Sequence, residues 1–401
     1  MDARLHVLIV DDAVDICQSL EMQLLDYGVF KASWCLSGEE ALALIEKQPA
    51  KYDAVFIDLH MPGMDGLELM HRLSEMQYAG GVVIISALGA RAINLTLEAV
   101  SNYHLRLLGS LEKPFDESLV AFMVRRIKNS MPNVSSQVPL LRRKDVLEAL
   151  RARQMVNYYQ PQVSSIDNRV VGFECLARLN LNGEGLIGAN RFIAVAERFQ
   201  LMDLILDCQM ENLGQDLANL KALVGNDCRF SINLSAQQLY NDTLPEYLAD
   251  LAENYSVPLD CLRLEVPENQ AIMEDKQLKN IHRLSINGFN LSLDNYGQGY
   301  ANLRQITRMP FSAVKLNTQM TEGIHNDKIM RLIVESIRLQ TQMAGIELVA
   351  LGVVQPEDLL ALADINVDAY QGRLFCPSKS AEELQAWVPS WYESQTIRPW
   401  R

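Results

Sequence analysis

Short apolar runs alternate with amphipathic stretches through the first third of the chain. Residues 7–10, 54–57, 82–85 and 105–111 are rich in aliphatic residues, and residues 14–25 have the spacing of an amphipathic helix. Strands that alternate with helices predict a parallel sheet covered by helices. The pattern therefore indicates an α/β domain at the start of the chain.

A polar, proline-containing segment at 129–136, NSMPNVSS, suits a boundary between two domains. We predict a first domain over 1–128, a linker over 129–144 and a second domain over 145–395. The second part is another βα series, in which apolar strands each finish on a polar residue, at 170–174, 230–233, 262–265, 291–294, 314–315 and 369–371. Catalytic groups of a (β/α)8 barrel lie at these strand ends, and such a barrel takes about 250 residues. The second domain is therefore predicted to be a (β/α)8, TIM-like barrel with polar groups gathered at one mouth.

Charge and cysteine usage narrow the classes of function. With 36 Lys and Arg against 50 Asp and Glu, the formal charge of −14 opposes binding to nucleic acid. The seven cysteines are scattered without a CxxC pair, which argues against a disulfide framework or a zinc site. No signal-like segment or apolar run long enough for a bilayer is present. We expect a cytoplasmic protein that binds neither nucleic acid nor membranes.

Polar residues at the strand ends of the first domain form a candidate phosphoryl-transfer site. Asp11 and Asp12 follow the first strand, Asp58 ends the third, Ser86 ends the fourth and Lys113 follows the fifth. All five are expected at one sheet edge, where α/β sheets bind ligands. The three carboxylates could bind Mg²⁺, and Asp58 could act as the nucleophile. Lys113 could neutralise the charge of the phosphoryl group, and the Ser86 hydroxyl could sense the product.

The motifs LIVDD, FIDLHMPGMDG, IISA and LEKPF resemble the response-regulator receiver family over residues 4–128. The resemblance implies a doubly wound, five-stranded, flavodoxin-like fold, Mg²⁺ as cofactor and Asp58 as the phosphoacceptor. It also implies a cognate histidine kinase or phosphotransfer protein as partner. Family members usually carry an aromatic switch residue three positions before the lysine, where this chain has Ser110.

The second domain resembles the EAL-type cyclic di-GMP phosphodiesterases over residues 145–390. Glu174, Leu176 and Arg178 stand at the E-x-L-x-R positions, and the motifs SINLSAQQL, LEVPEN, LDNYGQGYANL, AVKLN and QGRLF follow in family order. The resemblance implies that four residues could hold one Mg²⁺ or Mn²⁺, namely Glu174, Asn233, Glu265 and Asp294. It further implies ligand contacts from Gln160, Arg178, Glu268 and Gln371, and a role for Lys315 in orienting the attacking water.

Four positions depart from that family's acidic pattern. Asn295 stands where the second metal site uses a carboxylate, Asn317 replaces the acid two residues after the lysine, and LGVV puts Leu351 and Val354 in both acidic places of an E-G-V-E loop. Loss of an acid–base group typically costs about 10²–10⁴ in rate. We therefore predict a degenerate barrel that hydrolyses little or no cyclic di-GMP, with Lys315 vestigial.

Three functions stay open at this point. The leading hypothesis is a pseudo-enzyme in which phosphorylation of Asp58 changes how the barrel associates with itself or with an active EAL phosphodiesterase. The segment from Tyr296 to Arg308, which includes Gly297, Gly299 and Tyr300, lies where barrels of this family commonly pair. We expect a homo-oligomer. The alternatives are a receptor that binds cyclic di-GMP without turnover and a weak, metal-dependent phosphodiesterase.

Overall fold

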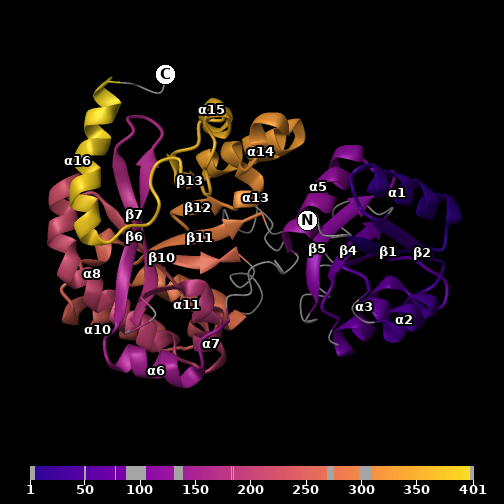
Figure 1. The fold of residues 1–401 in the computed structure, drawn as a ribbon, viewed down its shortest axis with the longest axis horizontal. Coiled ribbons are helices and arrows are strands. Elements are labelled where there is room, and N and C mark those ends of the chain that lie inside the picture. The colour runs from indigo at the N-terminus through magenta and orange to yellow at the C-terminus, as the bar shows by residue number, and fades with distance from the viewer. Residues whose placement is uncertain are drawn as a thin grey trace. The chain divides into compact units, whose positions relative to one another are not determined.

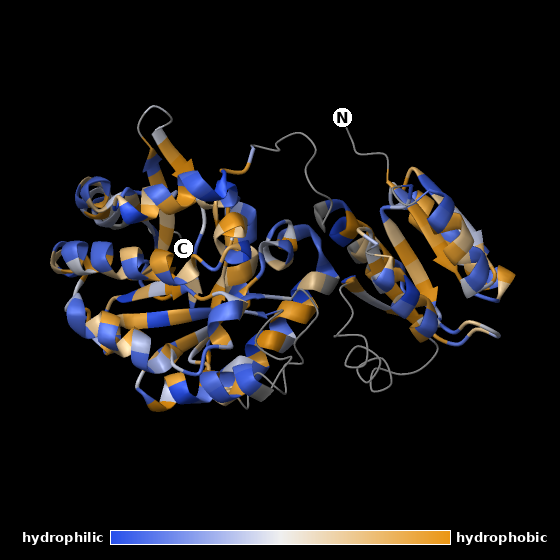
Figure 2. Cartoon of the chain, turned by 90° about the horizontal axis from the view of Figure 1, so that it is seen from below, coloured by the Kyte–Doolittle hydropathy of each residue, from blue (hydrophilic) through white to orange (hydrophobic). Residues whose placement is uncertain are grey.

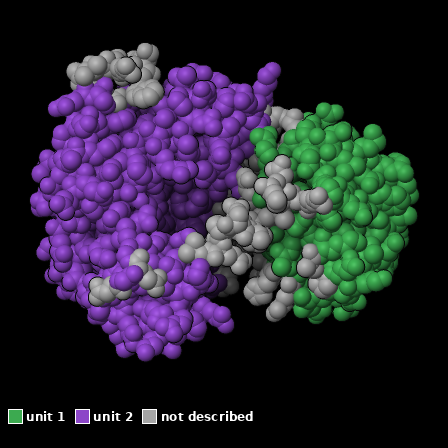
Figure 3. All heavy atoms as spheres, in the orientation of Figure 1, with its two compact units in different colours: residues 1–137 green, residues 138–401 purple. Residues whose placement is uncertain are grey.

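The computed structural model describes residues 5–48, 51–76, 78–86, 105–130, 139–181, 183, 185–268, 275–297 and 309–397. The chain forms two compact units, residues 1–137 and residues 138–401 (Figure 3). The division falls inside the predicted linker at 129–144, and the predicted domain limits stay a prediction. Each unit is described by itself below.

The first unit is a five-stranded parallel sheet with the order β2-β1-β3-β4-β5 (Figure 1). This is the doubly wound order of flavodoxin-like folds, with the switch point between β1 and β3. The predicted fold class is confirmed. The elements are β1 (His6–Val10), α1 (Val14–Asp26), β2 (Lys31–Cys35), α2 (Gly38–Lys47), β3 (Ala54–Asp58), α3 (Gly66–Glu75), β4 (Gly81–Ser86), β5 (Arg106–Glu112) and α5 (Glu117–Ser130).

Helices cover both faces of this sheet, and the strands therefore carry apolar side chains on both sides. Along β1, Leu8 and Val10 pack into the core under α2 and α3, whereas Val7 and Ile9 pack into the core under α1 and α5. A strand buried on both faces reads as a continuous apolar run. The run at 82–85 was recognisable as a strand for this reason, since every residue of β4 is buried.

The second unit is a closed barrel of eight strands, in which β6 pairs with β14 on one side and with β7 on the other. The predicted TIM-like barrel is confirmed, with one feature that the pattern did not predict: β6 runs antiparallel to both neighbours. Orange strands surrounded by amphipathic helices mark its core in Figure 2. The strands are β6 (Met155–Ser164), β7 (Val170–Leu181), β8 (Gly185–Gly188), β9 (Arg229–Asn233), β10 (Leu262–Pro267), β11 (Asn290–Tyr296), β12 (Ala313–Leu316), β13 (Glu347–Ala350) and β14 (Ala369–Tyr370).

The expected end of the first motif strand at Glu174 was wrong, because β7 continues to Leu181. Beyond Glu174 it stays paired with antiparallel β6 and forms a hairpin with β8, the ninth strand of the sheet. Residues 175–181 alternate between buried and exposed, as expected for a strand with one solvated face. Glu174 is thus a mid-strand residue at the level where the other barrel strands end.

Helices cover the outside of the barrel (Figure 1). No helix in the described part of the chain is both long and apolar enough to cross a membrane. Their bounds are α6 (Arg143–Arg151), α7 (Ile193–Arg198), α8 (Met202–Val224), α9 (Ala236–Leu239), α10 (Leu244–Asn254), α11 (Asp275–Ile286), α13 (Thr318–Thr321), α14 (Lys328–Ala344), α15 (Pro356–Asp364) and α16 (Ala381–Ile397).

Candidate functional site

The receiver strand ends bring the five predicted residues to one edge of the sheet. Ligand oxygens of Asp11, Asp12 and Asp58 lie within 4.8 Å of one another, as a single divalent cation requires. The Lys113 ammonium lies 2.6 Å from an oxygen of Asp11 and 3.2 Å from an oxygen of Asp58. Asp12 is exposed, so this carboxylate group opens to solvent. The donor set fits Mg²⁺, a hard cation that prefers oxygen ligands.

Burial and crowding set the electrostatics of this edge. Burial raises the pKa of the Asp58 carboxyl, Lys113 opposes that shift, and the neighbouring Asp11 charge adds to it. Burial on its own lowers the pKa of Lys113, but Asp11 and Asp58 more than compensate and raise it. The ammonium is therefore held in its charged form, and the crowded carboxylates favour a further cation.

Two hydroxyl positions accompany the site. Ser86 is fully buried at the end of β4, and its carbonyl accepts a hydrogen bond of 2.9 Å from the Lys113 backbone. Ser110 lies in β5 opposite Ile84, two residues before the pair formed by Ser86 and Glu112. Residues 87–104, between β4 and β5, are outside the described part of the chain. The structure therefore places Ser110 on the expected strand without testing its role as a switch.

Lys315 lies at the centre of the barrel mouth. Its ammonium is 2.6 and 2.7 Å from the two oxygens of Glu265, 3.1 Å from Glu174 and 3.7 Å from Asp294. The Lys315 and Glu265 side chains are fully buried. The structure thus gathers the carboxylates named from the sequence, but an ammonium group lies among them.

Amide side chains complete this network around Glu174. Asn233 donates to one oxygen of Glu174 at 3.1 Å, and Gln371 donates to the other at 2.6 Å. Gln371 also donates to Gln160 at 3.2 Å and accepts from Gln162 at 3.1 Å. Sequence reasoning missed Gln162, although its position two residues after Gln160 on the same strand face was a usable signal.

The pKa shifts follow from three carboxylates that share one cation. Burial tends to lower the pKa of Lys315, but the charges of Glu174, Glu265 and Asp294 raise it strongly. Glu174 ends with a lowered pKa, because Lys315, Gln371 and Asn233 outweigh its burial. Burial and repulsion between the acids raise the pKa of Asp294 and bring that of Glu265 to about 8, despite the opposing charge of Lys315. We take Lys315 as charged and Glu174 as its firmly ionised counterion.

The metal-binding spacing differs between the two carboxylate groups. In the described residues, the group formed by Asp11, Asp12 and Asp58 is the one set of acidic, His or Cys side chains whose ligand atoms all approach within 4.8 Å. At the barrel mouth the Lys315 ammonium touches both oxygens of Glu265. A cation there would compete with the ammonium, although the oxygen donors have the right chemistry.

The remaining ligand-binding candidates lie near the same mouth. Arg178 stacks over the ring of Tyr158 at 5.1 Å and donates to the Ser378 hydroxyl at 2.9 Å, and its buried Nε has no hydrogen-bond acceptor among the described residues. Glu268 is buried and accepts a hydrogen bond of 3.1 Å from the backbone N–H of Gly297. Arg178 is therefore positioned by Tyr158 and Ser378, whereas Glu268 anchors the backbone at Gly297.

Four positions where the EAL family has acidic residues hold amide or aliphatic side chains in this chain. Asn295, with φ of 55°, donates its amide N–H to Asp294. Asn317 caps α13 by accepting a hydrogen bond of 2.8 Å from the Gln319 backbone. Leu351 is partly buried directly after β13, and Val354 is 44% exposed. The four positions predicted to be degenerate therefore hold no carboxylate. Asn295 bonds to Asp294, Asn317 caps a helix, and the other two side chains are aliphatic.

Comparison with known families finds two matches. The response regulator receiver domain matches residues 7–125, and the EAL domain matches residues 143–378. The two matches fall on the two structural units. The match to the EAL domain covers more than half of the chain.

Curated relatives include the cyclic di-GMP phosphodiesterase RocR of Pseudomonas aeruginosa, 27% identical over 342 residues, which are 84% of this chain and 87% of RocR. The cyclic di-GMP phosphodiesterase NbdA of the same organism is 28% identical over 58% of this chain. The chain spans 30% of the length of NbdA. RocR is therefore a relative of similar extent, whereas NbdA shares a part only.

Among solved structures, the PaMucR phosphodiesterase in complex with c-di-GMP is 28% identical and has a TM-score of 0.56. That likeness covers 60% of this chain and 98% of the solved chain. The EAL enzyme Bd1971, bound to cAMP and cyclic di-GMP, has a TM-score of 0.57 over 61% of this chain and 68% of its own. At 23% identity the latter supports the fold alone.

Proposed function

Because the chain belongs to the EAL domain family and carries a response regulator receiver domain before its barrel, we propose a phosphorylation-controlled regulator in cyclic di-GMP signalling whose barrel does not hydrolyse cyclic di-GMP. Phosphorylation of Asp58 is the input. The output is a change in how the barrel associates with an active EAL phosphodiesterase or with itself. The proposal needs surface complementarity and no chemistry at the barrel mouth.

The four departing positions carry the proposal, and the contacts of Lys315 are consistent with it. The Lys315 ammonium contacts both oxygens of Glu265 and one of Glu174, and so satisfies charge that a metal would otherwise neutralise. Hydrolysis needs an activated water, which metal ions or a general base supply. The four departing positions, Asn295, Asn317, Leu351 and Val354, supply no carboxylate that could act as a general base or as a charged metal ligand.

The receiver half supports an intact input. Asp11, Asp12 and Asp58 have the spacing and chemistry to hold Mg²⁺, which would neutralise charge on a transferred phosphoryl group. Asp58 would be the nucleophile, Lys113 would contact the phosphoryl oxygens and Ser86 would contact the product. A cognate histidine kinase or phosphotransfer protein would supply the phosphoryl group.

The association step rests on the barrel's relationship to active enzymes. RocR and NbdA are named as cyclic di-GMP phosphodiesterases, and a relative of this kind is the binding partner that we propose for a barrel without four of the family's acids. Self-association would use the segment from Tyr296 to Arg308, of which residues 298–308 lie outside the described chain. We expect a homo-oligomer in the absence of such a partner.

The test is cyclic di-GMP hydrolysis by the full chain with Mg²⁺ and with Mn²⁺, before and after a phosphoryl mimic such as beryllofluoride binds at Asp58. We expect no product in either state. The same preparations are then added to an active EAL phosphodiesterase, whose rate should change when the mimic is present. Turnover by the chain itself, or unchanged rates of every cognate phosphodiesterase, would refute the proposal.

A second candidate is a receptor that binds cyclic di-GMP without cleaving it. The observation that favours it is Arg178, whose planar guanidinium suits a phosphate and lies over Tyr158 beside Ser378. Gln160 and Gln371 would contact the ligand from the same mouth. Calorimetry with cyclic di-GMP should then give a heat that Arg178→Ala removes, and no heat at high ligand concentration excludes this role.

A weak, metal-dependent phosphodiesterase is the third candidate, favoured by relatives that are named as active enzymes. One Mg²⁺ or Mn²⁺ would then be held by Glu174, Asn233, Glu265 and Asp294 after Lys315 moves. Asn295 would supply a carbonyl oxygen and Glu268 would replace a missing acid. A flat product trace with both metals rules this out.

A further inference from the structure

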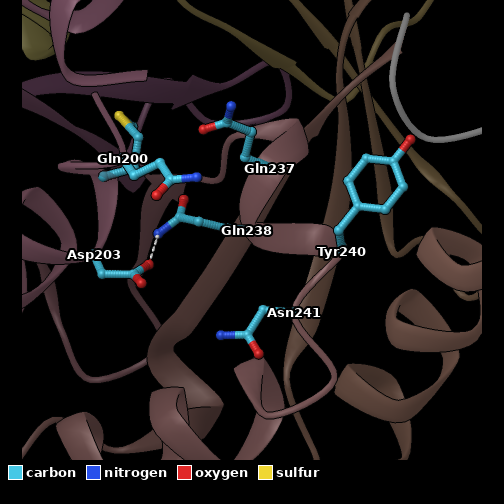
Figure 4. Close-up of a pocket in the computed structure, with 7 residues that line it drawn as sticks. Gln200, Asp203, Gln237, Gln238, Tyr240 and Asn241 are labelled. Carbon is cyan, nitrogen blue, oxygen red and sulfur yellow. Dashed lines mark hydrogen bonds between the residues drawn. The ribbon is translucent and has the colours of Figure 1, made fainter. Parts of the chain in front are cut away.

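A second pocket opens on the side of the barrel between the start of α8 and the α9 turn, with a cavity volume of about 430 Å³ (Figure 4). This lies in the range of about 300–1,000 Å³ usual for small-molecule sites. None of its lining residues belongs to the barrel mouth described above. The lining consists of four amide side chains, one carboxylate, one phenol and one thioether: Gln200, Gln237, Gln238, Asn241, Asp203, Tyr240 and Met202.

Gln238 fixes the orientation of the carboxylate in this pocket. Its side-chain oxygen accepts from the backbone N–H and the hydroxyl of Ser235, which leaves its amide N–H groups facing Asp203. One of them donates to Asp203 Oδ1 at 2.9 Å. Each carboxylate oxygen accepts about two hydrogen bonds, so Asp203 keeps open acceptor positions on both oxygens.

Asn241 supplies a hydrogen-bond donor, in contrast to the acceptor oxygens of Asp203. Its side-chain oxygen accepts from the backbone N–H and the hydroxyl of Thr243, at 3.0 and 2.9 Å. The amide nitrogen of Asn241 is therefore the end left to donate. Figure 4 shows Gln200, Asp203 and Gln238 turned toward one another, with Asn241 beneath them. The pocket thus offers a paired acceptor and a separate donor, both held in place by their own hydrogen bonds.

The end of α7 holds Gln200 in place at the rim of the pocket. Gln200 has a φ of 56°, and the backbone N–H groups of Gln200 and Leu201 donate to the carbonyls of Glu197 and Ala196, as in a left-handed helix end. The amide side chain of Gln200 reaches toward Gln238 (Figure 4).

Positive charge lies next to the pocket in the sequence. Phe199, the residue before Gln200, is 40% exposed, and the guanidinium groups of Arg143 and Arg198 lie 5.3 and 5.6 Å from its ring centre. Within the described chain, neither guanidinium forms an ion pair with a carboxylate. Arg143 and Arg198 therefore place two positive charges beside Phe199, the residue that precedes Gln200 in the sequence.

We propose that this pocket binds a guanine mononucleotide. The Watson–Crick edge of guanine presents two adjacent N–H donors, which match the paired oxygens of Asp203, and a carbonyl oxygen, which matches the Asn241 amide. Adenine offers one donor and a ring-nitrogen acceptor on that edge, and the acceptor would face the carboxylate. The phosphate would lie toward Arg143 and Arg198, for which the planar guanidinium is well suited.

The test is calorimetry of the full chain with GMP, with AMP as the matched ligand. We expect heat with GMP and at least ten-fold weaker binding of AMP. Asp203→Asn should weaken GMP binding about ten- to hundredfold, because it removes a charged acceptor from two donors. Asp250→Asn, the same change at an exposed carboxylate on α10, should leave the affinity unchanged, and circular dichroism checks the fold of both variants.

One further result decides how the base is recognised. Asn241→Asp should weaken GMP binding by placing an acceptor against the guanine carbonyl. Absence of GMP heat at millimolar ligand, equal binding of AMP, or an Asp203→Asn variant that binds normally would each refute the site.

Discussion

Both units place a lysine among carboxylates at the ends of parallel strands, yet the two lysines do different things. Lys113 reaches one oxygen each of Asp11 and Asp58, and Asp12 beside them stays exposed. Lys315 is fully buried and touches both oxygens of Glu265. The receiver site keeps open oxygens for a cation, whereas the barrel has an ammonium in the corresponding role.

The neighbouring residues explain why similar groups reach different states. The receiver keeps two adjacent acids after β1, Asp11 and Asp12. The barrel has Asp294 followed by Asn295, whose amide donates to Asp294 and adds no charge. A cluster of carboxylates with one acid fewer carries less negative charge. It is therefore stabilised less by a divalent cation and is better matched by a single positive charge. The difference between an ion site and a salt-bridge network therefore depends on a few positions around a shared pattern.

The largest effect is expected from restoring the barrel acids. Asn295→Asp, Asn317→Asp and Leu351→Glu together should raise cyclic di-GMP hydrolysis about 10²–10⁴-fold over the unaltered chain, because they return metal ligands and a base. Asp tolerates the left-handed backbone at 295 and can replace Asn317 as a helix cap, so the fold should accept both changes. Product formation with Mn²⁺ measures the gain.

The matched control for that variant adds Glu174→Gln, which should return the rate to background by removing a central carboxylate. If the triple variant is silent and Val354→Glu adds nothing, the shape of the mouth differs from that of an active enzyme. The comparison between the two units would then depend on more than their acids.

Replacing each lysine by methionine should lower the free energy of unfolding by a different amount in the two units. Lys315→Met leaves buried carboxylates without their cation, and breaking a buried ion pair in this way costs about 3–5 kcal/mol of unfolding free energy. Lys113→Met should cost about 1 kcal/mol, because that group opens to water and can take up a cation. Denaturant unfolding measures both, with Trp34 reporting on the receiver and Trp387 and Trp391 on the barrel in matched Trp→Phe backgrounds.

Added Mg²⁺ sharpens the same test. It should recover much of the stability of Lys113→Met and little of that of Lys315→Met. Equal recovery in both variants would mean that the barrel carboxylates accept a metal once the ammonium is gone, and would favour the weak phosphodiesterase.

The fold and the strand-end residues could be predicted because they follow local rules. Apolar runs identified most strands, and polar residues at their ends identified Asp58, Glu265 and Lys315. The end of β7 was missed because its continuation depends on pairing with the distant, reversed strand β6 and on the hairpin with β8, neither of which leaves a local signal.

Side-chain networks were harder to predict than positions. The sequence indicated that Lys315 faces the mouth, but not that it would bind Glu265 through both oxygens, because that depends on depth and on neighbouring charges. The pocket around Asp203 was not predicted, although Gln237 and Gln238 belong to the motif SINLSAQQL. Its residues come from helices and a turn, where no strand end marks them.

The affinity for Mg²⁺ should depend on the carboxylates of the first unit and not on those of the barrel. Asp12→Asn removes one ligand of the receiver group and should weaken Mg²⁺ binding about 10–100-fold. Glu174→Gln in the barrel should leave the Mg²⁺ affinity of the full chain unchanged, since Lys315 competes there. Calorimetry with Mg²⁺ compares the two variants, and a loss of binding sites in the barrel variant would contradict the proposed difference.

The smallest effect concerns Asp216, a partly buried carboxylate that is paired with a tyrosine and not with a lysine. Tyr159 on β6 donates to Asp216 on α8 at 2.7 Å, and burial raises the pKa of Asp216 while this bond opposes the shift. Tyr159→Phe removes the bond and should raise that pKa further. The expected loss is about 1 kcal/mol at pH 7.

The pH dependence of that loss has a definite sign. A raised pKa in the folded state means that Asp216 favours folding when protonated and that this contribution is lost as pH rises through the folded-state pKa. The deficit of Tyr159→Phe relative to the unaltered chain should therefore shrink as the pH falls toward the ordinary range of Asp. Tyr370→Phe is the control, because Tyr370 is a buried tyrosine whose hydroxyl forms no hydrogen bond within the described chain. If the loss of unfolding free energy in Tyr159→Phe stays constant with pH, the Tyr159 hydroxyl contributes to packing alone. Its hydrogen bond would then have no effect on the ionisation of Asp216.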